Sequence, residues 1–279
     1  EKIADILKED KVEKLGFEAK EVSYHTYKDY KEKFGENVEM ISTKDLVQKI
    51  RLVKEESEIE KIKKAIEITD KAFEHILDYI EVGKTEKEIA LELEYFMKKQ
   101  GGEKNAFDFI VASGKRSSMP HGVASDKKIE YGDFVTMDFG TFYQGYCSDM
   151  TRTIVVGEAS EKQKDIYNKV LEAHNAVIEQ IKPGMTGKEA DAIARDIITD
   201  AGYEDNFGHG LGHGIGVEVH EGPRASYTSD NEIKPGMLVT DEPGIYIADW
   251  GGVRIEDDLL ITEDGCKSLN NSPKELIVL

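Results

Sequence analysis

The sequence predicts an α+β protein made of two related halves that face each other across a pseudo-twofold axis. Two internal matches support this prediction. Residues 80–101 align with residues 181–202 at an offset of 101, and residues 131–140 align with residues 235–244 at an offset of 104. The first pair carries helix start and stop signals, whereas the second pair places acids among apolar strand residues. We therefore expect helices on the outside of a curved antiparallel sheet.

Residues 1–52 precede the duplicated part and show a mixture of helix and strand patterns, with "GFEAKEVSY" (16–24) as the expected strand. This segment is too small and too polar to form a complete domain. Residues 53–279 are long enough to form a domain with its own core. Because the chain begins with Glu1 inside a helical pattern, we expect it to be a fragment of a longer protein.

Helix signals are clear after residue 52. Apolar residues recur at helical spacing from position 59 to position 80, and Ser57 with Glu60 forms the expected capping box at the start of this helix. Matching capping boxes and glycine stops then bound one helix in each half: Thr85, Glu88 and Gly101 in the first, and Thr186, Glu189 and Gly202 in the second.

Composition excludes several classes of protein. The 56 acidic and 37 basic residues give a net charge of -19, which argues against nucleic acid and anionic membranes as partners. The two cysteines, Cys147 and Cys266, form no disulfide framework, and no apolar run approaches a membrane span. With no visible signal peptide, we expect a cytoplasmic protein.

Each half presents two acids on neighbouring strands. Asp138 aligns with Glu242, and a hairpin-like stretch leads from each to a second acid, Asp149 and Glu256 respectively. Four buried carboxylates repel one another, and two divalent cations would balance their charge. Carboxylate oxygens suit Mn²⁺, while one imidazole suits Mn, Co, Fe or Zn equally. The sequence therefore favours a two-metal site.

Each acid also has a simpler interpretation. Asp138 lies in a kinase-like D-F-G triplet, but no glycine-rich phosphate loop and no H-R-D loop accompany it. Asp149 could cap a turn, Glu242 could be a turn residue before Pro243, and Glu256 could belong to a solvated acidic run, "RIEDD". The duplicated register of the acids argues against four independent coincidences.

The stretch "HGLGHGIGVEVHE" (209–221) holds three of the seven histidines. Glycine at every second position weakens any helix, so the spacing predicts an extended segment that places His209 and His213 on one face and His220 on the other. Leu211, Ile215, Val217 and Val219 would share the face of His209 and His213. The glycines would permit another group to approach closely.

Together, "HGLGHGIGVEVHE", "TDEPGIY", "GGVRIEDD" and the pair of Asp138 and Asp149 resemble the pita-bread-fold metallopeptidases, which include methionine aminopeptidase, aminopeptidase P and prolidase. The resemblance covers residues 55–279. Residues 1–52 resemble the end of the creatinase/prolidase-type N-terminal domain, which methionine aminopeptidase lacks. The resemblance therefore implies a remnant of that domain with its linker at 1–52, a catalytic domain at 53–279 and a proline-specific enzyme.

The resemblance also implies the roles of individual residues. Asp138 would bind one metal ion, Asp149 and Glu256 would bridge both, and His213 and Glu242 would hold the second. A water between the ions would attack the peptide bond, and Glu242 would carry its proton to the leaving nitrogen. Substrate would contact the remaining candidates: His121 on the leaving-group side, His220 at the scissile carbonyl, and His209, Arg254 and Tyr246 in the wall. Arg254 could instead orient a ligand carboxylate.

The remaining histidines, His25, His75 and His174, are expected to be structural or surface residues. The resulting hypothesis is a homodimeric Xaa-Pro aminopeptidase that uses two divalent metal ions. Mn²⁺ is the preferred metal, and Co²⁺, Zn²⁺ and Fe²⁺ are the alternatives. Its substrate would be a small peptide with proline in second position. The alternative is prolidase, which cleaves the dipeptide Xaa-Pro; methionine aminopeptidase, a non-catalytic binding module and a metal-free, creatinase-like hydrolase are further alternatives.

Overall fold

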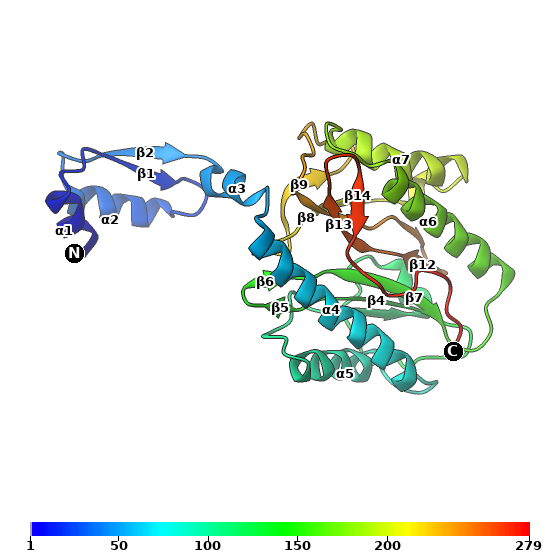
Figure 1. The fold of residues 1–279 in the computed structure, drawn as a ribbon. Helices are drawn as coiled ribbons and strands as arrows, with labels where there is room; N and C mark the ends of the chain where they lie inside the picture. The colour runs from blue at the N-terminus through cyan, green and yellow to red at the C-terminus, as the bar shows by residue number, and fades with distance from the viewer. Residues whose placement is uncertain (1) are drawn as a thin grey trace. The chain divides into compact units, whose positions relative to one another are not determined.

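The computed structural model describes residues 2–279, and the chain divides into two compact units between Arg51 and Leu52 (Figure 1). Each unit is described by itself below. Within residues 2–279, no helix combines the length and apolar character that crossing a bilayer requires.

The first unit has a β-α-β arrangement with a parallel strand pair. Its elements are α1 (Lys2–Glu9), β1 (Lys14–Glu18), α2 (Tyr24–Phe34), β2 (Glu39–Thr43) and α3 (Leu46–Arg51). The predicted strand at 16–24 is wrong in its extent, because Ser23 already caps α2 by accepting a hydrogen bond from the Thr26 N–H at 3.1 Å. Among residues 2–51 only Leu7 is buried, which agrees with the polar character of this segment.

The second unit begins with two helices and an antiparallel sheet of three strands, in the order β3-β4-β7. These elements are α4 (Glu56–Tyr79), α5 (Glu86–Lys99), β3 (Ile110–Ser113), the short 3₁₀ helix η1 (Gly114–Ser118), β4 (Phe134–Phe139) and β7 (Met150–Val155). A small hairpin, β5 (Phe142–Tyr143) with β6 (Tyr146–Cys147), lies between β4 and β7 in sequence.

The following residues repeat this order of helices and strands, although the 3₁₀ helix comes before the first strand instead of after it. The elements are α6 (Glu161–Gln180), α7 (Gly187–Asp200), η2 (Glu204–Asn206), β8 (Gly212–Gly214), β10 (Leu238–Asp241) and β13 (Asp257–Ile261), with the hairpin β11 (Gly244–Ile247) and β12 (Gly251–Arg254) between β10 and β13. Two flanking strands, β9 (Glu221–Ala225) and β14 (Cys266–Ser268), extend the sheet to the order β14-β13-β10-β8-β9. Strands β8-β10-β13 thus match β3-β4-β7, which confirms the predicted duplication.

Details at the helix ends also repeat. Thr85 and Thr186 form capping boxes with Glu88 and Glu189, as predicted. Gly101 and Gly202, just beyond α5 and α7, have φ of 104° and 81°, the left-handed backbone that favours glycine at a helix stop. The predicted Ser57–Glu60 box is wrong: α4 begins earlier, and its capping box joins Glu55 to Glu58, whose Oε2 accepts the Glu55 N–H at 2.7 Å.

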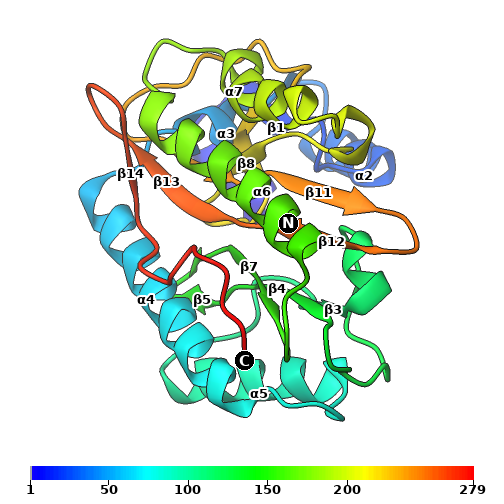
Figure 2. The ribbon, with the colours of Figure 1, turned by 90° about the vertical axis from the view of Figure 1, so that its right-hand side faces the viewer.

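The helices cover the outer sides of the strands (Figures 1 and 2). Apolar residues of α4 and α5 share one core cluster with β3, β4 and β7, and those of α6 and α7 share another with the five-stranded sheet. Instead of the single sheet predicted, two antiparallel sheets abut. They meet where the Glu256 N–H donates to the Thr151 carbonyl at 3.1 Å, which brings the acids of both halves together.

The extended segment predicted for 209–219 is wrong beyond β8. A β-bulge follows His213, the chain bends through 215–220, and β9 returns antiparallel with His213 opposite Arg224. Leu211 and Ile215 are fully buried whereas Val217 is exposed, so the alternate residues do not share one face. Glycine does permit close approach here, since a Cβ at Gly212 would lie 2.0 Å from the Thr240 carbonyl oxygen.

Candidate metal centre and substrate cavity

Four acidic side chains gather where the two sheets meet. Asp138 lies in β4 and Glu242 follows β10, while Asp149 precedes β7 and Glu256 precedes β13. They line a cavity of about 470 Å³. Nine of the ten predicted site residues line it: His121, Asp138, Asp149, His209, His213, His220, Glu242, Arg254 and Glu256. The tenth, Tyr246, lies behind this wall and bonds to His209.

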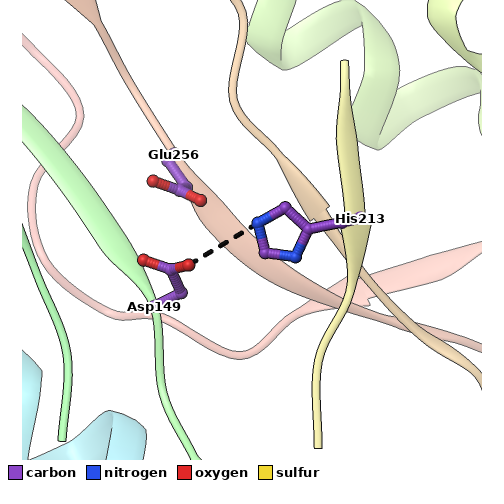
Figure 3. Close-up of side chains that lie close together, drawn as sticks. All are labelled: Asp149, His213 and Glu256. Atoms are coloured by element: carbon purple, nitrogen blue, oxygen red, sulfur yellow. Dashed lines mark ion pairs between the residues drawn. The ribbon is translucent and has the colours of Figure 1, made fainter. Parts of the chain in front are cut away.

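Asp149, His213 and Glu256 form a close group of potential metal ligands (Figure 3). One ligand atom from each lies within 4.8 Å of the others. His213 Nε2 is 3.7 Å from Asp149 Oδ2 and 3.5 Å from Glu242 Oε1. The His213 Nδ1–H donates to the Gly214 carbonyl at 3.1 Å, which leaves the Nε2 lone pair directed at the carboxylates. Burial, reinforced by neighbouring His220, lowers the pKa of His213 to about 3 and keeps this imidazole neutral.

The carboxylates fit divalent cations. Burial and then the neighbouring carboxylates raise the pKa of Asp149 and Glu256 well above their ordinary values. Burial is also the main cause that raises the pKa of Glu242 to about 8. Asp138 Oδ1 and Asp149 Oδ1 are buried without a hydrogen-bond partner among the described residues. Unpartnered, mutually repelling oxygens beside a neutral imidazole form a donor set that fits divalent cations.

A short chain of hydrogen bonds holds two of these carboxylates, Glu256 and Asp138. Thr151 Oγ1 donates to Glu256 Oε2 at 2.6 Å and accepts from Arg254 Nε at 2.9 Å. Arg254 Nη2 donates to Asp138 Oδ2, so one guanidinium connects acids of both halves. Arg254 was expected from the sequence to orient a carboxylate, whereas Thr151 was not among the predicted residues.

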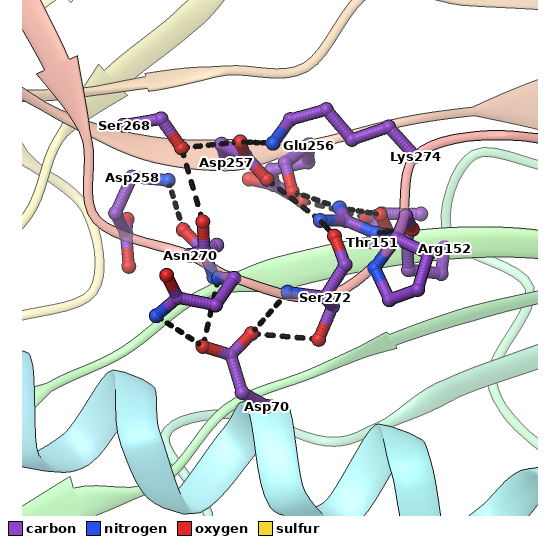
Figure 4. Close-up of polar contacts among 12 residues, drawn as sticks. Asp70, Thr151, Arg152, Glu256, Asp257, Asp258, Ser268, Asn270, Ser272 and Lys274 are labelled. Atoms are coloured by element: carbon purple, nitrogen blue, oxygen red, sulfur yellow. Dashed lines mark hydrogen bonds and ion pairs between the residues drawn. The ribbon is translucent and has the colours of Figure 1, made fainter.

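A second polar network surrounds the Glu256 carbonyl group and the side chain of Asp257 (Figure 4). Arg152 Nη2 pairs with Asp257 Oδ1 at 2.8 Å, and Arg152 Nη1 donates to the Glu256 carbonyl at 2.7 Å. His174 lies 3.0 Å from Asp241 and 3.6 Å from Asp257, and all three side chains are fully buried. The interpretation of "RIEDD" as a solvated acidic run is therefore wrong, and His174 is a buried structural residue.

Three further histidines surround the cavity. The His220 ring lies 4.3 Å from the His213 ring, because the β8–β9 hairpin folds one toward the other. His209 Nδ1–H donates to the Gly210 carbonyl at 2.8 Å, so its Nε2 accepts from Tyr246 Oη at 2.9 Å. His121 lies on the loop after η1 and is exposed at the cavity.

Arg224 is a cavity residue that the sequence analysis missed. It lies in β9 opposite His213, and its side chain has no hydrogen bond or ion pair to any described residue. Alternation from His220 through Gly222 to Arg224 was the available signal, because these positions share one face of an extended strand. Arg224 therefore adds a free positive charge beside the histidines.

Two protein-family models match this chain. The model of metallopeptidase family M24 matches residues 60–263, and that of the Creatinase/Prolidase N-terminal domain matches residues 1–53. The Xaa-Pro dipeptidase of Pyrococcus furiosus is 51% identical over 277 residues, which are 99% of this chain and 78% of the relative.

Solved structures agree closely with the fold. A Xaa-Pro dipeptidase from Bacillus anthracis has a TM-score of 0.97 at 55% identity, covering 100% of this chain and 78% of that chain. An X-Pro aminopeptidase from Thermotoga maritima has a TM-score of 0.95 at 44% identity, covering 99% of this chain and 78% of that chain. These matches confirm the predicted α+β fold of the pita-bread type.

Proposed function

This chain belongs to metallopeptidase family M24, and from that premise we propose that it hydrolyses Xaa-Pro dipeptides, as prolidases do. As a metallopeptidase it is a hydrolase that works with divalent metal ions. In this proposal residues 53–279 are the catalytic domain, and residues 1–52 are part of a creatinase/prolidase-type N-terminal domain with its linker. The observation that carries the proposal is the cavity that combines the four carboxylates, four histidines and Arg224, whose charge no described side chain pairs.

We therefore favour dipeptidase activity over the aminopeptidase activity expected from the sequence. Two named dipeptidases share 51% and 55% identity with this chain, compared with 44% for the aminopeptidase. Arg224 supports the same choice, because a dipeptide carries its carboxylate immediately after proline, whereas a longer peptide has a neutral amide there. A guanidinium binds a carboxylate through two parallel hydrogen bonds.

Five side chains would hold the metal ions: Asp138, Asp149, His213, Glu242 and Glu256. We propose two Mn²⁺ ions, since four carboxylates and one imidazole form a mainly oxygen donor set. When bound, the ions supply Lewis acidity and make water nucleophilic at neutral pH.

The protein's own groups complete the chemistry. Glu242 Oε1 faces His213 and the cavity, and we assign it the proton transfer to the leaving imino nitrogen of proline. Burial lowers the pKa of His220, so the neutral ring can donate a hydrogen bond to the scissile carbonyl oxygen as negative charge develops there. His121 lies at the leaving-group side, while His209 and Tyr246 form the wall.

Hydrolysis of Ala-Pro and Ala-Pro-Ala by chelator-treated protein, with and without Mn²⁺, tests the proposal. We expect metal-dependent cleavage of Ala-Pro and little cleavage of Ala-Pro-Ala. Release of alanine from the tripeptide with comparable kcat/KM would establish the aminopeptidase instead. A folded protein that binds two ions and cleaves neither peptide would favour another N-terminal specificity, and one that binds no metal would favour a binding module or a metal-free hydrolase.

The role of Arg224 is tested by Arg224→Met, with Arg224→Lys as the matched control that keeps the charge. A charge-assisted hydrogen bond contributes about 1.5–3 kcal/mol, so KM for Ala-Pro should rise by about tenfold to a hundredfold in Arg224→Met. In Arg224→Lys, KM for Ala-Pro should rise by a smaller factor. An unchanged KM in Arg224→Met would remove the carboxylate argument for dipeptide specificity.

A further inference from the structure

The loop that carries His121 is held at both ends by one buried carboxylate. Glu86, the first residue of α5, is fully buried. Its Oε1 accepts the Ser113 N–H at 2.7 Å and the Ser113 hydroxyl at 2.9 Å. Its Oε2 accepts the Ser125 N–H at 3.0 Å and the Ser125 hydroxyl at 2.6 Å. Ser113 precedes the loop 114–125 and Ser125 ends it, so a single side chain closes the base of this loop.

Arginine side chains extend this restraint to the centre of the loop. Arg116 pairs with Glu86 Oε2 at 3.0 Å and donates from Nη2 to the Val123 carbonyl at 2.7 Å. Arg254 Nη1 donates to the Pro120 carbonyl at 3.2 Å. His121 lies between these two carbonyl groups, so the backbone is held on both sides of the imidazole that lines the cavity.

Glu86 is not needed to cap its helix, because Thr85 and Glu88 already form the capping box of α5. The equivalent position in the second half, at the offset of 101, is Gly187. A Cβ there would lie 2.0 Å from the Arg224 carbonyl oxygen, so the second half has no room for any side chain. Within the described residues, this clamp is therefore a feature of the first half, whose loop brings His121 to the cavity.

We propose that Glu86 is a positioning residue, which fixes the loop 114–125 and so places His121 against the leaving-group side of the substrate. The proposal rests on the proposed function for the role of His121. Glu86 itself does not line the cavity. The substitution Glu86→Gln keeps the shape of the side chain but directs an amide NH₂ at hydrogen-bond donors, so one end of the loop loses its acceptor.

Activity measurements in two backgrounds test this coupling. Misplacement of a substrate-contacting group by about 1 Å can cost a hundredfold in rate, so Glu86→Gln should lower kcat/KM for Ala-Pro by about tenfold to a hundredfold. In the His121→Ala background the same substitution should cost less than about twofold, because the two residues act as one unit. Equal losses in both backgrounds would overturn the proposal. Glu88→Gln, two residues along the helix, is the matched control, since glutamine also completes a capping box.

Hydrogen exchange of the loop gives a readout that does not need activity. Peptides covering 114–125 should exchange faster in Glu86→Gln than in the parent or Glu88→Gln, while peptides covering 212–225 should not change. Unchanged exchange in 114–125 would overturn the clamp even if the enzyme cleaves Ala-Pro. Faster exchange in a protein that cleaves no Xaa-Pro peptide would support the clamp and refute the proposed function. Ser125→Ala, which removes one hydroxyl donor, should show a smaller effect in the same direction and serves if Glu86→Gln does not fold.

Discussion

Thr151 connects Glu256, a proposed metal ligand, to Arg254, and its hydroxyl group can be removed almost without a change of shape. The side chain is fully buried in β7. Its Oγ1 donates to Glu256 Oε2 at 2.6 Å and accepts from Arg254 Nε at 2.9 Å. Thr151→Val therefore deletes both hydrogen bonds and leaves the packing nearly intact.

The size of the effect follows from these two contacts. A hydrogen bond to a charged group contributes about 1.5–3 kcal/mol, and loss of a partner behind a metal ligand costs about tenfold to a hundredfold in metal affinity or activity. Because a factor of ten corresponds to about 1.4 kcal/mol, these two ranges agree. We expect the Mn²⁺ affinity of Thr151→Val to fall by about tenfold to a hundredfold. The unpaired Arg254 Nε should also lower the free energy of unfolding by about 1–3 kcal/mol.

Isothermal titration calorimetry of chelator-treated protein with Mn²⁺ measures the affinity, and urea unfolding measures the stability. Thr151→Ser is the matched control, because it keeps the hydroxyl and should bind Mn²⁺ like the parent protein. If Thr151→Val binds Mn²⁺ within about twofold of Thr151→Ser, the hydrogen bond to Glu256 does not orient a metal ligand.

Two further predictions concern the carboxylates themselves. Asp149→Ala or Glu256→Ala should abolish metal loading, and two ions per chain found by elemental analysis in either variant would contradict the proposed role of that residue as a metal ligand. In the metal-free protein, the pKa of Glu242 is raised from 4.5 to about 8. The stability that its protonated form contributes is present below the unfolded value and is lost as the pH rises through about 8. The urea midpoint of chelator-treated protein should therefore be lower at about pH 8 than at about pH 5.5, and saturating Mn²⁺ should remove this difference. Equal urea midpoints at both pH values without metal would contradict the prediction that burial raises the pKa of Glu242.

The duplicated fold could be predicted because its signals are local. The capping boxes at Thr85 and Thr186 need only residues three positions apart, and these predictions are confirmed. The start of α4 was placed wrongly because Glu55, a residue seldom found at an N-cap, forms the box there instead of Ser57. The N-cap preferences of single residues cannot decide between two possible helix starts that lie two positions apart.

The hairpin and the polar partners could not be predicted in the same way. The bulge after His213 depends on β9 pairing back onto β8, which alternation along one segment does not reveal. Arg152 and Thr151 follow one another in β7, where charged and hydroxyl side chains suggest solvent exposure. They are buried because their partners, Glu256 and Asp257, lie 105 residues further along the chain, at the start of β13. Only the tertiary structure brings these groups together.

Both halves contribute acids to the cavity, but they differ in the other residues that they place around it. Asp138 and Glu242 still occupy equivalent strand ends, as expected if each half supplies carboxylates to a common centre. Only the second half folds a hairpin that presents His213 and Arg224, and at its Gly187 the backbone of that hairpin fills the space of a side chain. The first half uses the same space for Glu86, which holds the loop of His121. In the proposed function, the same helix start thus supports substrate binding in two ways, because the second half places a strand there and the first half places a carboxylate.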